Sequence, residues 1–580
     1  MMKTPEALMR DARTGQWLIF RHPRRVVATH DLATVRPLMS DIERAVREQG
    51  LWAAGFLSYE AGPAFDAALA AHSPLGDVPL LWFGLFDAPE RLETLPWPRS
   101  DAFHLGPLQS PMNATAYTTT IAAIKAAIAR GDVYQVNFTF PIFAPFDGDP
   151  RTFFLHIQQN QHARFAAYLE IGDLVISSAS PELFFYRDHE RVWMRPMKGT
   201  APRGNAIAED ERLAQELAAS LKNRAENVMI VDMVRNDLGR IAEIGSVRTT
   251  DLFRIESYPT LFQMTSTVQA RTSASLVRLL DAVFPAASIT GAPKVSATRI
   301  IRQLETGPRG VYTGAIGFLS PDSRAQFNVA IRTAVIHRKA QTLRYDVGSG
   351  VVWDSEADSE FDECWLKAQA LTRPIPRFQL LESLLWTPEQ GFVLLDRHLH
   401  RMCASASTFR FPCPVETMRQ RLDALIRTLP PRQHKIRLLL ASDGSIHIEA
   451  ALLQPASTPQ RIALASFPVE PDDLFLRHKT TRREIYETAM RAHPQEDDVL
   501  LWNRRGELTE SARANLVLSL GGQMWTPAAS SGLLPGVLRA ELLAQGKIRE
   551  AILTKDDLHS ADAVYLINSV RGWMPATVVE

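Results

Sequence analysis

The spacing of apolar and polar positions changes along the chain, and it predicts a mixture of strands and helices. Short apolar runs typical of strands occur at "LVISSASPELFFY" (174–186) and "FNVAIRTAVIH" (327–337). Longer stretches with helical spacing occur at "AYTTTIAAIKAAIARG" (116–131) and "DERLAQELAASLKNRAENVMIVDMVRNDLG" (210–239). This mixture predicts an α+β fold with large sheets over residues 1–110 and 115–370.

A proline-rich connector separates this part from a second one. The stretch "LTRPIPRF" (371–378) follows a charged helical pattern and precedes a new strand pattern. Proline restricts its own backbone and that of the residue before it, so the connector predicts a domain boundary with little slack. We therefore expect residues 379–580 to form a further domain.

Composition narrows the class of protein. The 580 residues include 64 Lys and Arg against 64 Asp and Glu, which leaves no excess charge to attract nucleic acid or anionic lipid. No run approaches the roughly 18 apolar residues of a membrane span, so we expect a cytoplasmic small-molecule enzyme. The three cysteines lack the spacing of a metal site or a disulfide framework, and they are expected to be reduced thiols.

Several short segments of the first part carry residues suited to chemistry. Lys198 lies in "RPMKGTAPRG" (195–204), which is too broken by proline and glycine for a helix interior. Glu182 follows Pro181 at a strand start, and Thr290 precedes a helix whose free N–H groups suit an anion. Each residue alone also fits a turn, a cap or an ion pair.

Taken together, these segments resemble the chorismate-utilising enzyme family. The resemblance is strong over residues 115–370 and weak at "GFLSYEAG" (55–62). It implies a four-layer α/β sandwich with the active site between two large sheets, and a requirement for Mg²⁺. The substrate-binding residues that it implies are Thr290, Tyr312, Arg332, Gly348, Gly350 and Lys367.

The resemblance also implies a metal region at Glu226, Glu360 and Glu363. Mg²⁺ favours a few carboxylates and retained waters, which agrees with this set. Glu360 and Glu363 would share one helix face, with Lys367 nearby. An exposed, salt-bridged helix is the alternative interpretation.

Lys198 distinguishes branches of this family. The anthranilate-forming branch has alanine there, in a P-I-A-G-T loop, whereas the branch that forms 4-amino-4-deoxychorismate has lysine. The resemblance implies that Lys198 adds to C2 of chorismate as the C4 hydroxyl leaves, with Glu182 as general acid, before ammonia adds at C4. Gln263 stands where many relatives have histidine, which leaves more of the proton transfer to Glu182.

Ammonia needs a source outside this chain. No cysteine lies in the glycine-rich turn that a glutamine amidotransferase would show. We therefore expect a separate glutaminase subunit.

The C-terminal part resembles the fold-type IV pyridoxal-phosphate enzymes. The resemblance rests on five segments: "DRHLHRM" (396–402), "RHKTTRREIYE" (477–487), "GELTESARANLVL" (506–518), "GLLPGVLR" (532–539) and "VYLINSVRGW" (564–573). It implies that Lys479 forms the Schiff base with pyridoxal 5'-phosphate and that Glu510 pairs with the pyridine nitrogen. The phosphate would be held by Arg401, Gly536, Val537 and Ser569.

The fusion of the two parts favours one function. The first part would make 4-amino-4-deoxychorismate, and the second would eliminate pyruvate from it to leave 4-aminobenzoate for folate. Two alternatives stay open: an anthranilate synthase fused to an amino-acid aminotransferase, and a synthase with a non-catalytic docking module. The sequence does not decide the oligomeric state, and a homodimer through the C-terminal domain is one arrangement that it allows.

Overall fold

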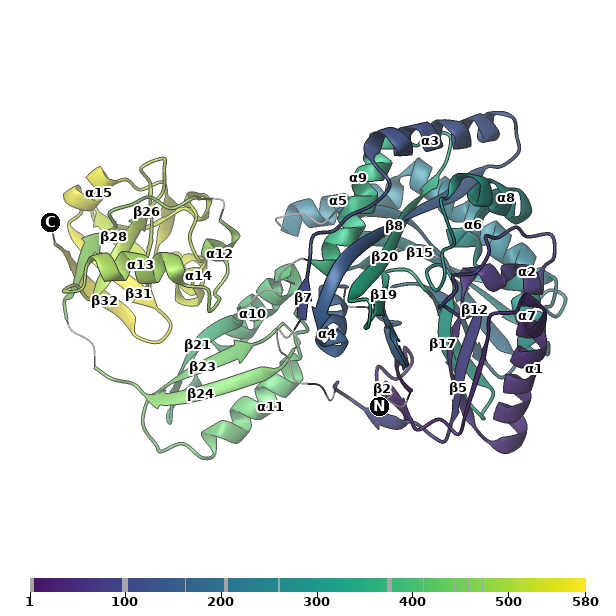
Figure 1. Ribbon diagram of the computed structural model, residues 1–580. Coiled ribbons are helices and arrows are strands. Elements are labelled where there is room, and N and C mark those ends of the chain that lie inside the picture. Colours follow the sequence, from purple (N-terminus) through teal and green to yellow (C-terminus); the bar gives the residue numbers. More distant parts are fainter. Residues whose placement is uncertain are drawn as a thin grey trace. The chain divides into compact units, whose positions relative to one another are not determined.

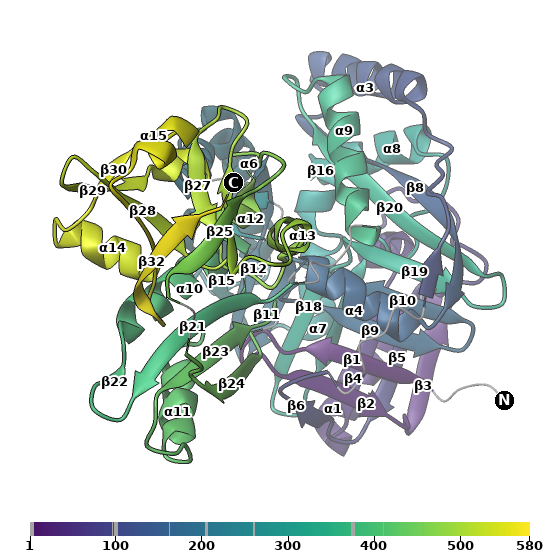
Figure 2. The ribbon, with the colours of Figure 1, turned by 90° about the vertical axis from the view of Figure 1, so that its left-hand side faces the viewer.

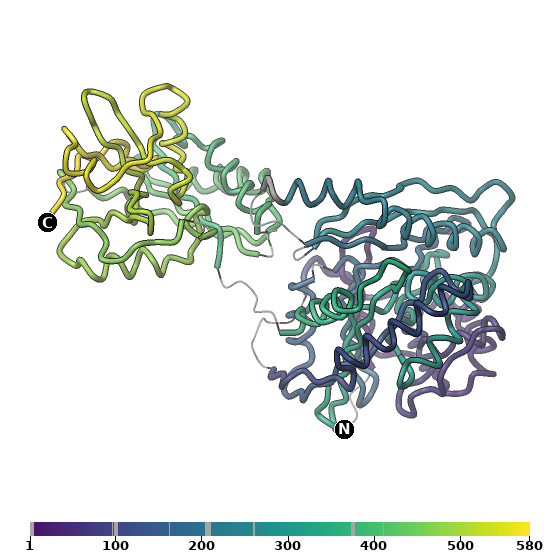
Figure 3. Tube along the Cα trace, turned by 90° about the horizontal axis from the view of Figure 1, so that it is seen from above, coloured from purple at the N-terminus to yellow at the C-terminus, as the bar shows by residue number. Residues whose placement is uncertain are grey.

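The computed structural model describes residues 5–95, 97, 103–161, 163–202, 207–258, 261–372, 378–409, 411–442, 444–455, 458–471 and 473–579. The chain forms two compact units, Met1–Gly204 with Ala208–Ile375 and Asn205–Ile207 with Pro376–Glu580. Figures 1 and 3 trace the chain through both. Residues 373–377 of the expected connector lie outside the described residues. Within the described parts, no helix combines the length and apolar character needed to cross a membrane.

The first unit is built on two 10-stranded sheets. In spatial order the first sheet contains β16 (Gly291–Ala292), β8 (Gln135–Gly148), β20 (Thr342–Val351), β19 (Thr333–His337), β10 (Leu174–Ser178), β9 (Ala167–Ile171), β1 (Glu6–Arg10), β2 (Trp17–Arg21) and β6 (Glu90–Leu92), with β7 (Phe103–Leu105) paired to β8. The second contains β13 (Met197–Pro202), β15 (Leu261–Arg271), β12 (Arg191–Arg195), β11 (Leu183–Asp188), β18 (Arg324–Val329), β17 (Ala315–Leu319), β4 (Trp52–Leu57), β5 (Leu81–Phe86) and β3 (Arg25–Thr29), with β14 (Arg248–Ser257) paired to β15.

Helices cover the outer face of each sheet. Those of this unit are α1 (Leu32–Gln49), α2 (Gly62–Phe65), α3 (Ala114–Ala129), α4 (Pro150–Gln161), α5 (Ile207–Ala219), α6 (Leu221–Gly239), α7 (Leu276–Val283), α8 (Lys294–Leu304) and α9 (Ala357–Ala368). Helices α3, α8 and α9 lie against β8 and β20 (Figure 2), whereas α1, α6 and α7 pack on the second sheet.

A buried apolar layer joins the inner faces of the two sheets. Phe20 and Leu169 of the first sheet share it with Phe56 and Phe318 of the second. The order helix, sheet, sheet, helix gives the four layers that the family resemblance implied. The predicted α+β class is confirmed.

The long helical stretch predicted at 210–239 forms two helices. Ser220 ends α5 and begins α6, where its hydroxyl accepts a hydrogen bond from the Asn223 backbone N–H. Serine favours this capping position because its side chain satisfies a backbone donor that the first helical turn leaves unpaired. Apolar spacing alone does not reveal this break.

The second unit contains two smaller sheets. The 4-stranded sheet has the order β22 (Gly391–Phe392), β21 (Leu380–Thr387), β23 (His434–Leu440) and β24 (Ile446–Leu452). The 8-stranded sheet has the order β27 (Leu508–Ser511), β26 (Asp498–Trp502), β25 (Gln460–Leu464), β32 (Gly572–Val578), β31 (Ala563–Asn568), β28 (Asn515–Leu520), β29 (Gln523–Pro527) and β30 (Arg549–Ala551). The helices are α10 (Leu395–Phe409), α11 (Val415–Ile426), α12 (Leu474–Arg477), α13 (Glu484–Ala492), α14 (Val537–Ala544) and α15 (Lys555–Ser560).

Two of the three cysteines are not reduced thiols, so that expectation is wrong for them. Cys403 on α10 forms a disulfide with Cys413, just before α11. Their Cα atoms are 5.7 Å apart, although ten positions separate them in sequence. The chain reverses direction after α10, and the reversal brings the two cysteines together. The number of residues between them in the sequence did not reveal it. Cys364 is free and buried.

Candidate active sites

Lys198 reaches from the second sheet of the first unit to a strand of the first sheet. It lies on β13, and its amine lies beside Gly350 on β20. A Cβ added to Gly350 would be 2.6 Å from Lys198 Nζ and 2.7 Å from Gln135 Nε2. Asn227 on α6 donates to the Lys198 carbonyl at 3.3 Å. The amine is therefore held between the sheets, where only a glycine leaves it room.

The surroundings of Lys198 favour its neutral form. Burial lowers the pKa of the Lys198 amine, while the carboxylates of Glu226 and Glu182 act in the opposite direction. A lower pKa increases the fraction of neutral amine, which is the nucleophilic form. The predicted nucleophile thus combines an acidic neighbourhood with loss of hydration.

Glu182 is buried beside Lys198. Its Oε1 accepts a hydrogen bond from Ser288 Oγ at 2.6 Å. Burial raises the pKa of Glu182 to about 7, although the Ser288 bond and the Lys198 charge oppose the rise. A carboxyl group that is still protonated near neutral pH can donate a proton to a leaving hydroxyl. This geometry suits the general-acid role predicted for Glu182.

Three of the predicted substrate-binding residues meet where β20 and α9 are adjacent. Arg332 Nη1 donates to the Lys367 carbonyl at 3.0 Å, and Lys367 Nζ donates to the Gly348 carbonyl at 2.7 Å. A Cβ on Gly348 would overlap the carbonyl of Phe138 on β8. The strands therefore approach closely enough that this position requires glycine.

Thr290 and Tyr312 are buried in the same unit. Thr290 Oγ1 donates to the Ala286 carbonyl at 2.8 Å, so its hydroxyl is already engaged. The Thr290 carbonyl accepts from Asn137 N, and Asn137 is the register partner of Gly350. Asn137 of β8 therefore connects Thr290, through a backbone hydrogen bond, with Gly350 on the neighbouring strand β20.

The three predicted metal ligands lie within electrostatic range of one another. Burial raises the pKa of Glu226, and the charges of Glu360 and Glu363 add to the rise. Glu363 also forms an ion pair with Lys367 at 2.8 Å. In the described parts of the chain, no three His, Cys, Asp or Glu side chains are gathered closely enough to hold a metal. The oxygen donors and mutual repulsion nevertheless fit Mg²⁺, and the assignment stays a prediction.

Two residues near Lys198 had no predicted role: Ser288, which binds Glu182, and Asn227, which holds the Lys198 backbone. Gln263, the departure from the family pattern, lies on β15 and accepts from Thr200 Oγ1 at 3.2 Å. Thr200 is two positions from Lys198, so Gln263 lies near the Lys198 strand. Its amide contributes a hydrogen bond and no titratable proton.

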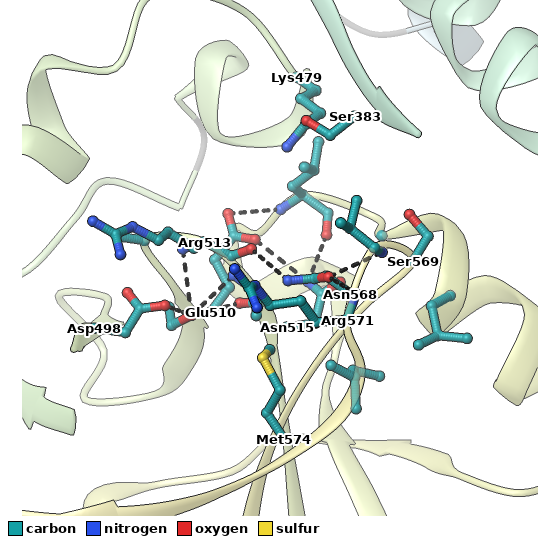
Figure 4. Close-up of a pocket in the computed structure, with 18 of the residues that line it drawn as sticks. Ser383, Lys479, Asp498, Glu510, Arg513, Asn515, Asn568, Ser569, Arg571 and Met574 are labelled. Atoms are coloured by element: carbon teal, nitrogen blue, oxygen red, sulfur yellow. Dashed lines mark hydrogen bonds between the residues drawn. The ribbon is translucent and has the colours of Figure 1, made fainter. Parts of the chain in front are cut away.

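In the second unit, all six residues predicted to hold the cofactor line one cavity of about 570 Å³ (Figure 4). They are Arg401, Lys479, Glu510, Gly536, Val537 and Ser569. Burial lowers the pKa of the Lys479 amine to about 8, and the charge of Arg401 adds to the effect. The Lys479 amine, with its lowered pKa, therefore lies in the same cavity as the other five residues predicted to bind the cofactor.

Glu510 lies buried at the side of this cavity. Its carboxylate accepts hydrogen bonds from Tyr486 OH at 2.8 Å, Leu534 N at 3.0 Å and Asn515 Nδ2 at 3.3 Å. Burial raises the pKa of Glu510 to about 7. A pyridinium N–H would give this carboxylate the positive partner that favours its ionised form.

A buried carboxylate with no predicted role orients Arg401. Glu382 on β21 accepts from Arg401 Nε at 2.8 Å and from Nη2 at 2.7 Å, and its Oε2 lies 2.7 Å from His398 Nδ1. Burial alone would raise the pKa of Glu382, but the charge of Arg401 and the hydrogen bonds from His398 and Arg401 together lower it to about 2. Arg401 Nη1 donates to the Pro535 carbonyl at 3.1 Å, next to Gly536.

The segment after Pro535 forms the rest of the predicted phosphate cup. Gly536 is the N-cap of α14, and a Cβ there would overlap Asn515 Oδ1. Val537 begins the helix, so its free N–H points out of the helix end. The cationic Arg401, this helix end and the amine of Lys479 fit a phosphorylated aldehyde cofactor.

Comparison with known proteins agrees with both folds. Residues 4–373 match the chorismate binding enzyme family, and residues 379–579 match the amino-transferase class IV family. The class IV fold implies pyridoxal phosphate.

Two curated relatives match the first unit. The aminodeoxychorismate synthase of Streptomyces griseus is 41% identical over 290 residues, covering 50% of this chain and 40% of that protein. Aminodeoxychorismate synthase component 1 of Salmonella typhimurium is 40% identical over 269 residues, covering 46% of this chain and 59% of that protein. The chain therefore spans about half the length of these curated relatives.

A solved structure supports the fold of the first unit. The crystal structure of anthranilate synthase component I from Streptococcus pneumoniae TIGR4 matches with a TM-score of 0.55 at 23% identity. The match covers 64% of this chain and 93% of that one. The chain belongs to the chorismate binding enzyme family, and a class IV aminotransferase fold follows that domain.

Proposed function

We propose that the chain makes 4-aminobenzoate in two steps. The first unit converts chorismate and ammonia to 4-amino-4-deoxychorismate and water, and the second unit splits this product into 4-aminobenzoate and pyruvate. The observation that carries the proposal is the Lys198 amine, held beside Glu182 and against Gly350. The names of the two curated relatives agree with the first step.

In the first step, Lys198 Nζ adds to C2 of chorismate while the C4 hydroxyl leaves as water with a proton from Glu182. Ammonia then adds at C4, and the lysine departs from C2 as the ring double bonds shift back. When bound by Glu226, Glu360 and Glu363, Mg²⁺ would neutralise a substrate carboxylate. Arg332 and Lys367 supply further positive charge for the substrate.

In the second step, the chain's own residues position and move protons. Pyridoxal phosphate, when bound, supplies an electron sink for the carbon that carries the amine. Lys479 removes the proton from that carbon and returns a proton to the departing enolpyruvyl group, which leaves as pyruvate while the ring becomes aromatic. Glu510 holds the cofactor's pyridine nitrogen in its protonated form, and Arg401 holds the phosphate.

Ammonia would come from a separate glutaminase. The "component 1" in the name of the Salmonella relative agrees with a two-protein system. A cytoplasmic location and a homodimer through the second unit belong to the same proposal. The Cys403–Cys413 disulfide is more typical of oxidising compartments, so a thiol count on freshly purified protein bears on the location.

Product analysis tests this function. The full chain is incubated with chorismate, ammonium, Mg²⁺ and pyridoxal phosphate, and the aromatic products are separated by chromatography. We expect 4-aminobenzoate with an equal amount of pyruvate. Pyruvate alone does not discriminate, because forming 2-aminobenzoate from chorismate releases it too. Appearance of 2-aminobenzoate would establish the anthranilate alternative, and accumulation of 4-amino-4-deoxychorismate would establish the docking-module alternative.

A further inference from the structure

The cavity of the second unit carries more positive charge than a cofactor phosphate requires. Arg401 and Lys479 already serve the predicted cofactor. The cavity is lined by five further cations: Lys435, Arg437, Arg483, Arg513 and Arg571. Three carboxylates, Asp497, Asp498 and Glu510, also line the cavity, which leaves an excess of four cations over acids. A phosphate carries about two negative charges at neutral pH, so about two positive charges are left for another anion.

Three of these cations are brought together by hydrogen bonds between distant segments. Asn568 Nδ2 donates to the Arg513 carbonyl at 3.4 Å, and Asn568 Oδ1 accepts from Arg571 N at 2.8 Å. Arg571 Nη1 donates to the Gln454 carbonyl at 2.9 Å, just after β24. Since β24 pairs with β23, which carries Lys435, Arg571 reaches the strand pair beside Lys435. Figure 4 shows Arg513, Asn568 and Arg571 around the same pocket as Lys479.

Ion pairs distinguish the cations that line this cavity. Arg437 forms an ion pair with Glu449 at 2.8 Å, but Lys435, Arg513 and Arg571 have no ion pair among the described residues. Arg513 Nη1 donates to a backbone carbonyl, that of Asp497, at 3.3 Å. Asp497 and Asp498 also line the cavity. The Asp498 carboxylate accepts from Ser511 Oγ and Val499 N, and it lies within electrostatic range of Arg513 without forming an ion pair with it.

The charges of this group repel one another. Burial lowers the pKa of Lys435, and the charges of Arg437, Arg571, Arg513 and Arg483 lower it further. Such a cluster is unfavourable in the empty protein and becomes favourable when an anion binds. Lys435, Arg513 and Arg571 are exposed, so an anion from solvent can reach all three.

We propose that Lys435, Arg513 and Arg571 form a subsite for a second carboxylate of the substrate. Because of this subsite, the cavity binds amines that have a six-membered ring and two carboxylates more tightly than it binds apolar amino acids. This inference rests on the function proposed above for the second unit, because 4-amino-4-deoxychorismate carries one carboxylate on its ring and one on its enolpyruvyl group. Arginine suits this task because its planar fork matches a carboxylate with two parallel hydrogen bonds.

A binding experiment on the full-length holoenzyme tests the subsite without turnover. Isophthalate, with two carboxylates, and benzoate, with one, are titrated while the visible absorbance of the bound cofactor and the heat of binding are followed. We expect isophthalate to bind at least about tenfold more tightly, the worth of one charge-assisted hydrogen bond. The double variant Lys435→Gln/Arg571→Gln should reduce that preference to below about twofold. Equal binding of both probes by the wild type, or an unchanged preference in the variant, would overturn the proposal.

A matched control and a turnover assay separate this subsite from the proposed function. Arg549→Gln removes an exposed arginine on β30, outside the cavity, and should leave both affinities unchanged. With 4-amino-4-deoxychorismate as substrate, Arg571→Gln should raise KM about tenfold with kcat within about twofold. Pyruvate release with an unchanged KM would refute the subsite and keep the lyase. Absence of pyruvate release with the isophthalate preference intact would refute the lyase and keep the subsite.

Discussion

The two units use the same pair of residue types in different electrostatic settings. Each has a lysine whose pKa is lowered chiefly by burial, Lys198 or Lys479. Each also has a buried glutamate, Glu182 or Glu510, whose pKa is raised by burial to about 7. The lysine and glutamate alone therefore do not distinguish the two chemistries.

The charges around each pair make the difference. Lys198 interacts mainly with acids, Glu226, Glu182 and Glu360, and such a site suits a divalent cation beside the substrate. Lys479 interacts with two arginines, Arg401 and Arg483, as well as with the carboxylates of Glu382 and Glu510, and the arginines suit an anionic cofactor. A lysine that has lost hydration can serve as a direct nucleophile or as the anchor of a cofactor, and its neighbours decide which.

The comparison is tested most strongly by exchanging each lysine for alanine. Lys198→Ala should reduce formation of 4-amino-4-deoxychorismate by about 10³-fold or more, since nucleophile and leaving-group proton transfer are both disturbed. Lys479→Ala should leave chorismate consumption unchanged, remove the cofactor's bound absorbance, and accumulate the intermediate. Liquid chromatography of chorismate, intermediate and 4-aminobenzoate reads out both steps.

Both lysine variants should keep the wild-type circular dichroism, because neither side chain belongs to an apolar core. Adding the Lys198→Ala protein to the Lys479→Ala protein should restore 4-aminobenzoate. Loss of both steps in either single variant would contradict two independent sites.

A smaller effect is expected from the acid of the first site. Glu182→Gln should lower the rate of the first step by about 10²-fold, the contribution of a general acid. The active form is protonated and the pKa is about 7, so the wild-type rate should fall as pH rises above 7. Single-turnover rates between pH 6 and 9 measure this, and the glutamine variant should lack that fall. A fall of equal size in the variant would assign the titration to another group.

The third effect is on stability and not on rate, and it concerns the residue that holds Arg401. Glu382→Gln should reduce the free energy of unfolding by about 3 kcal/mol at neutral pH, because the folded pKa of about 2 lies far below the ordinary 4.5. A carboxylate with a depressed pKa stabilises the fold above pH 4.5. This contribution is lost as pH falls toward 2, so the difference from wild type should shrink in that range. Urea unfolding at several pH values measures it.

Glu449→Gln is the matched control for this variant. It removes the half-exposed partner of Arg437 from the same small sheet and should cost less than about 1 kcal/mol. Equal costs for both variants would mean that burial of Glu382 contributes nothing beyond a surface pair.

The sequence offered candidates for the reacting residues but not for the residues that contact them. Lys198 and Lys479 lie in short segments whose residue order is informative, whereas Ser288 contacts Glu182 across 106 positions of the chain. Glu382 lies on an ordinary apolar strand, and its role depends on α10 packing across that strand. Partners that meet only through tertiary structure leave no local pattern.

The same reason explains the two structural corrections. Ser220 divides a stretch whose apolar spacing continues without interruption, because one side-chain hydrogen bond caps α6. Cys403 and Cys413 meet because the chain reverses after α10, which their spacing does not show. Periodicity therefore predicted the element types and the fold class, while caps and reversals needed coordinates.

The strand order of the first unit limits where the polypeptide can be divided. β1 pairs with β9 and β4 pairs with β17, so residues before 110 supply strands to both large sheets. A gene fragment starting at 115 would encode every candidate residue of that site, yet it would leave the β9 and β17 edges open to aggregation. A division between 373 and 377 keeps every sheet whole, so each part keeps all the strand pairings it has in the full chain.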